Sequence, residues 1–110
     1  MGAEPGIAAA ARLFKVLGSE SRLGLLRIVE REPRTVGALS EATGMSQPLV
    51  SQHLRTLRQA DLVLARRRGK EVVYEIADRH VAHVIADALA HVIEPASAGS
   101  DIEPPRKDAS

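Results

Sequence analysis

Residues that start and stop helices recur at short intervals along this 110-residue chain, and they limit which elements it can form. Side chains suited to cap a helix N-terminus precede four separate apolar segments. These caps are Ser19, Thr35, Ser46 and Asp78. Glycine or proline ends four segments, at Gly18, Pro33, Gly44 and Pro95. Together with the apolar spacing, these signals predict five helices, at 7–17, 20–31, 36–43, 47–58 and 79–93.

Apolar residues at helical spacing indicate which side of each helix faces the core. We expect Leu23, Leu26 and Ile28 to face inward from the second predicted helix. The fourth predicted helix carries its apolar repeat at Leu49, Val50, Leu54 and Leu57. Because the chain has one Phe, one Tyr and no Trp, this core must be aliphatic. A chain of this length holds one domain, and so small a core gains stability from a partner subunit.

Two β-rich runs lie between the fourth and the last predicted helices. They span 62–67 and 71–76 and flank the turn Arg68-Gly69-Lys70. The predicted fold is therefore mainly α-helical, with one β-hairpin that we call the wing. We expect the folded domain to span 7–94, between a flexible N-terminus at 1–6 and a disordered tail at 95–110.

Positive charge is concentrated in the middle of the chain, although the net charge of the whole chain is only +1. The segment 46–70 contains six basic residues and one acidic residue, a net charge of +5, which leaves −4 for the rest. A basic patch on a nearly neutral body indicates a polyanionic partner such as nucleic acid. A solvated charged surface is the alternative interpretation of the same residues.

The segment from Thr35 to Arg58 has the arrangement of a helix-turn-helix unit: a short helix, a turn at Gly44, and a second helix with a polar outer face. In such a unit the polar side of the second helix enters the major groove of DNA. That side carries Gln47, Ser51, Gln52, Arg55 and Arg58. The wing tip suits contacts to the DNA backbone or minor groove through Arg66, Arg67, Arg68 and Lys70. Two ordinary surface helices and a charged turn are the alternative.

The last predicted helix carries four side chains that can ligate a metal such as zinc, namely Asp78, His80, His91 and Glu94. His80 and His91 share a helix face but lie about 16 Å apart along the axis, whereas zinc ligands lie within about 2.2 Å of the ion. One helix therefore cannot bring both pairs to one ion. Two antiparallel copies can, with Asp78 and His80 from one subunit and His91 and Glu94 from the other. Without a metal, Asp78 is a helix cap and the other three are ordinary surface or structural residues.

The composition argues against several other functions. The chain contains no Cys, so thiolate metal sites, thiol catalysis and disulfides are not expected. It has no glycine-rich phosphate loop and no nucleophile-elbow serine, so an enzyme is not expected. A protein-interaction module on the same fold stays open. No apolar run reaches the ~20 residues of a membrane span, and no signal pattern opens the chain, so we expect a cytoplasmic protein.

Three stretches give the chain a resemblance to the ArsR/SmtB family of winged-helix repressors: LGSESRLGLL at 17–26, SQPLVSQHLRTLR at 46–58 and RGKEVVY at 68–74. The resemblance runs from about Ala8 to Glu94. It implies a homodimer packed through the first and last helices and bound to an imperfect inverted repeat in operator DNA. It places base contacts at Gln47, Ser51 and Gln52, and supporting contacts at Ser46, His53 and Arg55.

The same resemblance bears on the metal and on the direction of its effect. The spacing from Asp78 and His80 to His91 and Glu94 is similar to the last-helix site of the family's zinc and cobalt sensors. It implies that the apo protein represses and that Zn(II) releases it from DNA. Residues 1–12 and 95–110 contain no His that could add ligands, which favours four-coordinate zinc. A winged-helix repressor without metal regulation, and a nickel or cobalt sensor on the same scaffold, are the alternatives.

Overall fold

Five helices and one hairpin make up the computed structural model over the residues that it describes, 4–94. In chain order they are α1 (Ile7–Leu17), α2 (Glu20–Arg31), α3 (Val36–Thr43), α4 (Gln47–Gln59), β1 (Val63–Arg68), β2 (Glu71–Ile76) and α5 (Arg79–Ile93). The prediction of a mainly helical chain with one hairpin is confirmed. The prediction of a disordered tail at 95–110 lies outside the described residues.

Short polar side chains start four of these helices, as the sequence predicts. The hydroxyls of Ser19, Thr35 and Ser46 each accept a hydrogen bond from a backbone N–H three residues later, at 3.2, 3.1 and 3.3 Å. The Asp78 carboxylate accepts one from the backbone N–H of His80 at 2.8 Å. Because the first N–H groups of a helix lack partners within it, each hydroxyl cap contributes about 1 kcal/mol.

The core lies where α2, α3 and α4 meet, and it is aliphatic as expected. Its fully buried side chains are Leu25, Leu26, Val29, Leu39, Val50, Leu54, Leu57 and Leu62. Leu23 and Ile28, which the sequence predicts to face inward from α2, are partly buried and pack against the edge of this core. At 100° per residue they lie about 100–120° to either side of the buried Val29, so they flank the core.

The buried stripe of α4 consists of Val50, Leu54 and Leu57, and the prediction that Leu49 joins it was wrong. Leu49 is 39% exposed. It lies about 100° around the helix from Val50, which places it beside the stripe rather than in it. α4 therefore packs by a narrow apolar stripe and leaves most of its circumference to solvent.

β1 and β2 pair antiparallel along their whole length, and only Gly69 and Lys70 lie between them. Gly69 has a φ of +63°, a conformation that two-residue hairpin turns require and glycine adopts without strain. The turn therefore explains why a glycine interrupts the basic residues at the wing tip.

An isolated bridge fastens the base of the wing to the loop before α3. The Tyr74 N–H donates to the Arg34 carbonyl at 2.7 Å, and the Arg34 N–H donates to the Tyr74 carbonyl at 3.1 Å. β2 is thus paired on both sides at Tyr74, with β1 on one side and Arg34 on the other. The hairpin pattern alone does not indicate this bridge, because one residue carries no strand periodicity.

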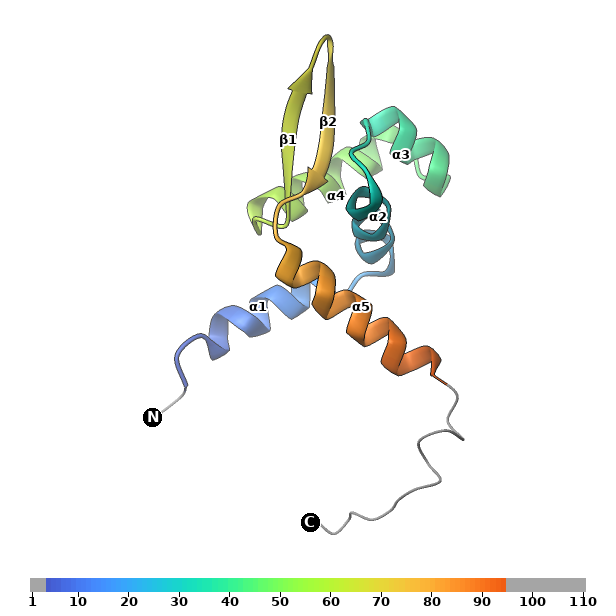
Figure 1. Cartoon of the computed structure of the whole chain (residues 1–110). Coiled ribbons are helices and arrows are strands. Elements are labelled where there is room, and N and C mark those ends of the chain that lie inside the picture. Colours follow the sequence, from blue (N-terminus) through green and yellow to red (C-terminus); the bar gives the residue numbers. More distant parts are fainter. Residues whose placement is uncertain (1–3, 95–110) are drawn as a thin grey trace.

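The elements divide between two ends of the molecule (Figure 1). α3, α4 and the wing lie at one end, and the wing extends away from the helices. α1 and α5 lie at the other end and diverge from each other beneath α2. Among the described residues, no helix has the length and apolar character needed to cross a lipid bilayer. α4 and the wing carry one group of candidate site residues, and α5 carries the other.

Candidate nucleic-acid interface and metal-ligating residues

Side-chain hydrogen bonds hold the turn between α3 and α4. The Ser40 hydroxyl donates to the Met45 carbonyl at 2.6 Å, and the Met45 N–H donates to the Thr43 hydroxyl at 3.2 Å. Between them Gly44 has a φ of +80°, the left-handed conformation that ends many helices. Leu39 of α3 belongs to the same core cluster as the buried stripe of α4. The direction in which α4 projects is therefore fixed by both packing and the turn.

The outer face of α4 carries most of the predicted DNA contacts. Exposed side chains include Ser46, Gln47, Ser51, Gln52 and Arg55. Ser51, Gln52 and Arg55 lie within about 100° of one another, on the side of the helix away from its buried stripe. No acidic residue occurs in α4. This face offers amide and hydroxyl groups that can pair with base edges, beside a guanidinium that suits guanine or phosphate.

His53 does not lie with the other predicted contacts. It is partly buried, on the flank of α4 about 160° from Arg55. Burial lowers the pKa of His53 below its ordinary value of 6.5, and the positive charge of Arg22 on α2 lowers it further. His53 therefore lies on the flank of α4, and the predicted supporting contact to DNA is not brought to the outer face.

The basic residues of the wing divide between its two faces. Directly paired residues point to the same face, and side chains alternate along each strand. Arg66 and Arg68 therefore share one face with Glu71 and Glu75. The Arg66 Nε donates to the Glu75 carboxylate at 2.7 Å, and Arg68 is paired directly opposite Glu71. The positive charge on this face is partly balanced within the wing itself.

Arg67 lies on the other face of the wing, paired opposite Val72 and on the same side as Tyr74. Neither Arg67 nor Lys70 forms an ion pair with any residue that the structure describes. Both side chains are exposed. These two cations are available to a polyanion, whereas Arg66 must first leave Glu75.

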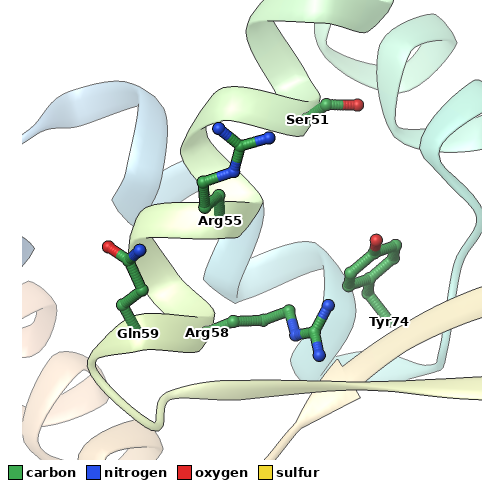
Figure 2. A pocket seen from close by; sticks show the side chains of 5 residues that line it. All are labelled: Ser51, Arg55, Arg58, Gln59 and Tyr74. Atoms are coloured by element: carbon green, nitrogen blue, oxygen red, sulfur yellow. The ribbon is translucent and has the colours of Figure 1, made fainter.

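A hollow of about 380 Å³ lies between α4 and β2. Figure 2 shows its lining residues: Ser51, Arg55, Arg58 and Gln59 from α4, and Tyr74 from β2. Sequence reasoning assigned no role to Gln59 or Tyr74, and it placed Arg58 only on the polar face of the helix. Helical spacing from Ser51 identifies Arg58 and Gln59, at i+7 and i+8, but only the register of the wing brings in Tyr74.

Asp78 and His80 lie together at the start of α5. The Asp78 Oδ1 accepts the hydrogen bond from the His80 N–H and lies 3.2 Å from the His80 Nδ1. The backbone N–H of His80 is the main cause that lowers the pKa of the Asp78 carboxyl below its ordinary value. The His80 side chain is 96% exposed. A carboxylate held deprotonated beside an exposed imidazole has the chemistry of a pair of metal ligands.

His91 and Glu94 lie at the opposite end of α5, where both are exposed. His91 comes eleven positions after His80, which is about 16 Å along the helix axis. Within residues 4–94, no three His, Asp or Glu side chains gather closely enough to hold a metal ion. The structure of one chain brings Asp78 to His80 but brings neither of them to His91 or Glu94.

An apolar groove of about 310 Å³ runs between α1, α2 and α5. Phe14 of α1 and Val92 of α5 are among its lining residues, and they are 57% and 70% exposed. Val84 in the same lining is 40% exposed. Large apolar side chains gathered on one surface are typical of an interaction site.

Known sequences match these features closely. The family model described as "Bacterial regulatory protein, arsR family" matches residues 19–65, which contain α2, α3, α4 and the start of β1. The chain is 40% identical over 81 residues to the HTH-type transcriptional regulator NmtR of Mycobacterium tuberculosis, covering 74% of this chain and 68% of that protein. The chain belongs to the ArsR family.

A second relative in this family is the HTH-type transcriptional repressor SmtB of Mycobacterium tuberculosis. It is 41% identical over 88 residues, which are 80% of this chain. The match spans 65% of SmtB, so the chain corresponds to just under two thirds of that relative's length. Both relatives are named as transcriptional regulators.

Solved structures support the same fold. Rv0081 of Mycobacterium tuberculosis has a TM-score of 0.72 at 35% identity, over 83% of this chain and 95% of that one. The 1–100 fragment of Mb0332 from Mycobacterium bovis has a TM-score of 0.71 at 29% identity, over 96% of this chain and all of that one. The latter is described as a homodimeric winged helix-turn-helix DNA-binding domain. The predicted winged helix-turn-helix fold is confirmed.

Proposed function

We propose that this ArsR-family chain is a transcriptional repressor that binds operator DNA as a homodimer in its apo form and leaves the DNA when Zn(II) binds at the dimer interface. The outer face of α4 carries the DNA part of this proposal, because it is exposed, polar and free of carboxylates. The name of the relative SmtB supports repression as the direction of control.

DNA recognition follows from the arrangement of α4 and the wing. Ser51 and Gln52 present short polar groups to base edges, and Arg55 extends the same face toward the backbone. Arg67 and Lys70 add charge from the wing, where no described carboxylate balances them. Each phosphate that these cations contact releases counterions, so binding weakens as salt rises.

The apolar groove between α1, α2 and α5 supports a homodimer. A second copy related by a twofold axis buries Phe14, Val92 and their neighbours against the same surface of its partner. The description of the Mycobacterium bovis relative as homodimeric favours the same assembly here. In such a dimer the two α4 helices reach successive major grooves about one helical turn of DNA apart, which fits an imperfect inverted repeat.

The residues at the two ends of α5 fit a shared zinc site. If two α5 helices pair antiparallel across the twofold axis, Asp78 and His80 of one subunit meet His91 and Glu94 of the other. Two imidazoles and two carboxylates then make up each of two equivalent four-ligand sites. Asp78 holds its cap through Oδ1, beside the exposed imidazole of His80. Zinc bound there supplies a fixed link between the two helices.

The link between the helices explains how the two ends of the molecule communicate. DNA binding needs the two α4 helices at one separation, and the packing of α1 and α5 sets that separation. A bridge between the α5 helices stabilises one arrangement of the subunits. When that arrangement mismatches the operator, zinc lowers DNA affinity, and DNA lowers zinc affinity by the same factor.

The decisive experiment measures binding of the full 110-residue chain to a duplex that is enriched from a random library by the chelator-treated protein. Fluorescence anisotropy at fixed salt, first with chelator and then with Zn²⁺, Co²⁺ or Ni²⁺, compares the wild type with His91→Ala. We expect zinc to weaken wild-type binding by about 5–150-fold, the usual range of allosteric coupling. His91→Ala should bind DNA as the wild type does in chelator and lose the response to zinc.

The alternatives give different results in the same experiment. A winged-helix repressor without metal regulation binds the duplex equally with chelator and with every metal. A nickel or cobalt sensor on the same scaffold responds to Ni²⁺ or Co²⁺ and ignores Zn²⁺. A protein-interaction module enriches no duplex, even at low salt. Exposed histidines at both ends of α5 are the observation that favours a metal response of some kind.

A further inference from the structure

The hollow between α4 and β2 is positively charged and contains no negative group. Its described lining consists of two guanidinium groups, Arg55 and Arg58, a hydroxyl and an amide from Ser51 and Gln59, and the phenol of Tyr74. Neither arginine forms an ion pair with another described residue. Two unpaired arginines that converge on one hollow suit an anion with several oxygens, because each guanidinium can donate two parallel hydrogen bonds.

The two walls of the hollow are held in place independently of any ligand. Tyr74 is paired through its backbone to Ala65 of β1 and to Arg34 on its other side, and its side chain packs partly against the core. Arg55 and Arg58 project from the helix whose buried stripe anchors the same core. Figure 2 shows Arg58 extending from α4 toward the ring of Tyr74. The protein core and the backbone pairing of the wing therefore fix the positions of α4 and β2 on either side of the hollow before any ligand binds.

The position of the hollow on α4 indicates what kind of anion it meets. Ser51 and Arg55 belong to the face that enters the major groove in the proposed function. Arg58 lies one turn further along, toward the C-terminal end of α4, where a helix in the groove passes the sugar–phosphate backbone. On the wing, Arg67 lies on the same face as Tyr74 and nearer the tip, so it extends the positive surface along the wing.

We propose that this hollow binds one phosphate of the operator backbone, with Arg58 and Arg55 donating to its oxygens and the Tyr74 hydroxyl as a further donor. The inference rests on the proposed function and adds two contacts to it, from Arg58 and from the Tyr74 hydroxyl, so that one phosphate links α4 and the wing to one point on the DNA. A phosphate contact does not depend on the base sequence, so this contact contributes equally to operator and non-operator binding. Arg58 and Tyr74 are positioning residues for the base contacts of Ser51 and Gln52.

The test compares Arg58→Ala, Arg58→Lys and Tyr74→Phe with Arg31→Ala, in the full chain. Arg31 is an exposed arginine in the last turn of α2 and has no described ion pair, which makes it a matched control for lost charge. Anisotropy is measured on the enriched duplex and on a random duplex over a range of salt concentrations. Thermal unfolding of each variant checks that the fold is unchanged.

We expect Arg58→Ala to lower the affinity for both duplexes by about 10-fold, as loss of a charge-assisted hydrogen bond does. It should also reduce the slope of log affinity against log salt by about 1. Arg58→Lys should keep the slope, because it keeps the charge, and lose part of the affinity, because it loses the fork. Tyr74→Phe should lower the affinity for both duplexes by less than Arg58→Ala does, with no change in the salt slope. Arg31→Ala should resemble the wild type.

A neutral methylphosphonate, placed at single backbone positions of the enriched duplex, identifies the phosphate itself. At one position it should reproduce the loss seen with Arg58→Ala, and combining the two should add nothing further. Additive losses at every position would overturn the inference.

Inorganic phosphate and free nucleotides test the other source of the same chemistry. If they bind the wild type below millimolar concentration and Arg58→Ala abolishes this without changing DNA affinity or slope, the hollow is a small-anion site and the inference is wrong. If the wild type binds duplex but Arg58→Ala matches Arg31→Ala, only this inference fails. If the wild type binds no duplex at low salt, the proposed function fails first.

Discussion

The surface formed by α4 and the wing differs from α5 in how much of its chemistry one chain supplies. On the first, Ser51 and Arg55 of α4 and Tyr74 of β2 line one hollow. On α5, the two candidate ligand pairs sit about 16 Å apart on one straight helix and cannot converge within the chain. The first surface is therefore complete in a monomer, whereas the second becomes a site only when another subunit supplies its other half.

This difference separates the two functions of the molecule physically. The proposed ligands all lie at the two ends of α5, whereas the proposed DNA contacts lie on α4 and the wing, whose tip points away from α5 (Figure 1). Substitutions at one end should change that end's binding and leave the other end's intrinsic affinity as it was. The two are coupled only through the arrangement of subunits, so the coupling is lost whenever either half-site is lost.

The largest effect is expected from His80→Ala. Removing one of four zinc ligands should weaken zinc binding by more than the ~100-fold that a lost outer-shell partner costs. The affinity for the enriched duplex in chelator should stay unchanged, because His80 is exposed and belongs to α5, not to α4 or the wing. Competition with a zinc-binding dye measures the first quantity, and anisotropy the second. Equal zinc affinity in variant and wild type would remove His80 from the site.

A smaller effect distinguishes the two faces of the wing. Arg67→Ala should weaken binding to any duplex by several-fold and reduce the salt slope by about 1. Arg66→Ala should have less effect on both, because the Arg66 guanidinium is already engaged by Glu75. Paired anisotropy titrations at several salt concentrations make the comparison. Equal losses from the two variants would show that the Arg66–Glu75 pair opens when DNA binds.

The smallest effect concerns the stability of α4 against pH. Burial and Arg22 lower the pKa of His53 in the folded state, so between that pKa and 6.5 the unfolded chain binds the proton more readily. The stability contribution is therefore fully present above pH 6.5 and is lost as pH falls through the folded-state pKa. Urea unfolding at fixed protein concentration should show this decline in the wild type and a shallower one in His53→Gln. If the stability of the wild type and of His53→Gln declined in parallel with falling pH, the pKa of His53 would not be lowered by folding.

The helices could be predicted from sequence because their ends are local. Ser19, Thr35, Ser46 and Asp78 each cap a helix with their own side chain, and Gly44 breaks one by its own backbone preference. Core positions were predicted less well. Leu23, Ile28 and Leu49 are as apolar as their buried neighbours, and only the crossing of α2, α3 and α4 decides which side of each helix is covered.

The site residues divide in the same way. Ser51, Gln52 and Arg55 could be predicted because helical spacing alone puts them on one face. Tyr74 could not, because its place beside α4 depends on the register of the wing and on the bridge to Arg34. The flank position of His53 likewise depends on where α2 packs. The proposed zinc ligands remain a prediction, since their second half belongs to another subunit.

A mixed dimer tests most directly whether the sensing site is shared between subunits. One chain carries Asp78→Ala with His80→Ala, and the other carries His91→Ala with Glu94→Ala. Each homodimer then holds only half-sites, but the mixed dimer holds one intact site, made of Asp78 and His80 from the second chain and His91 and Glu94 from the first. The account predicts that neither chain binds zinc tightly alone and that mixing restores tight binding of one zinc per dimer. If a mixture that is shown to contain the mixed dimer still binds no zinc tightly, the account is contradicted.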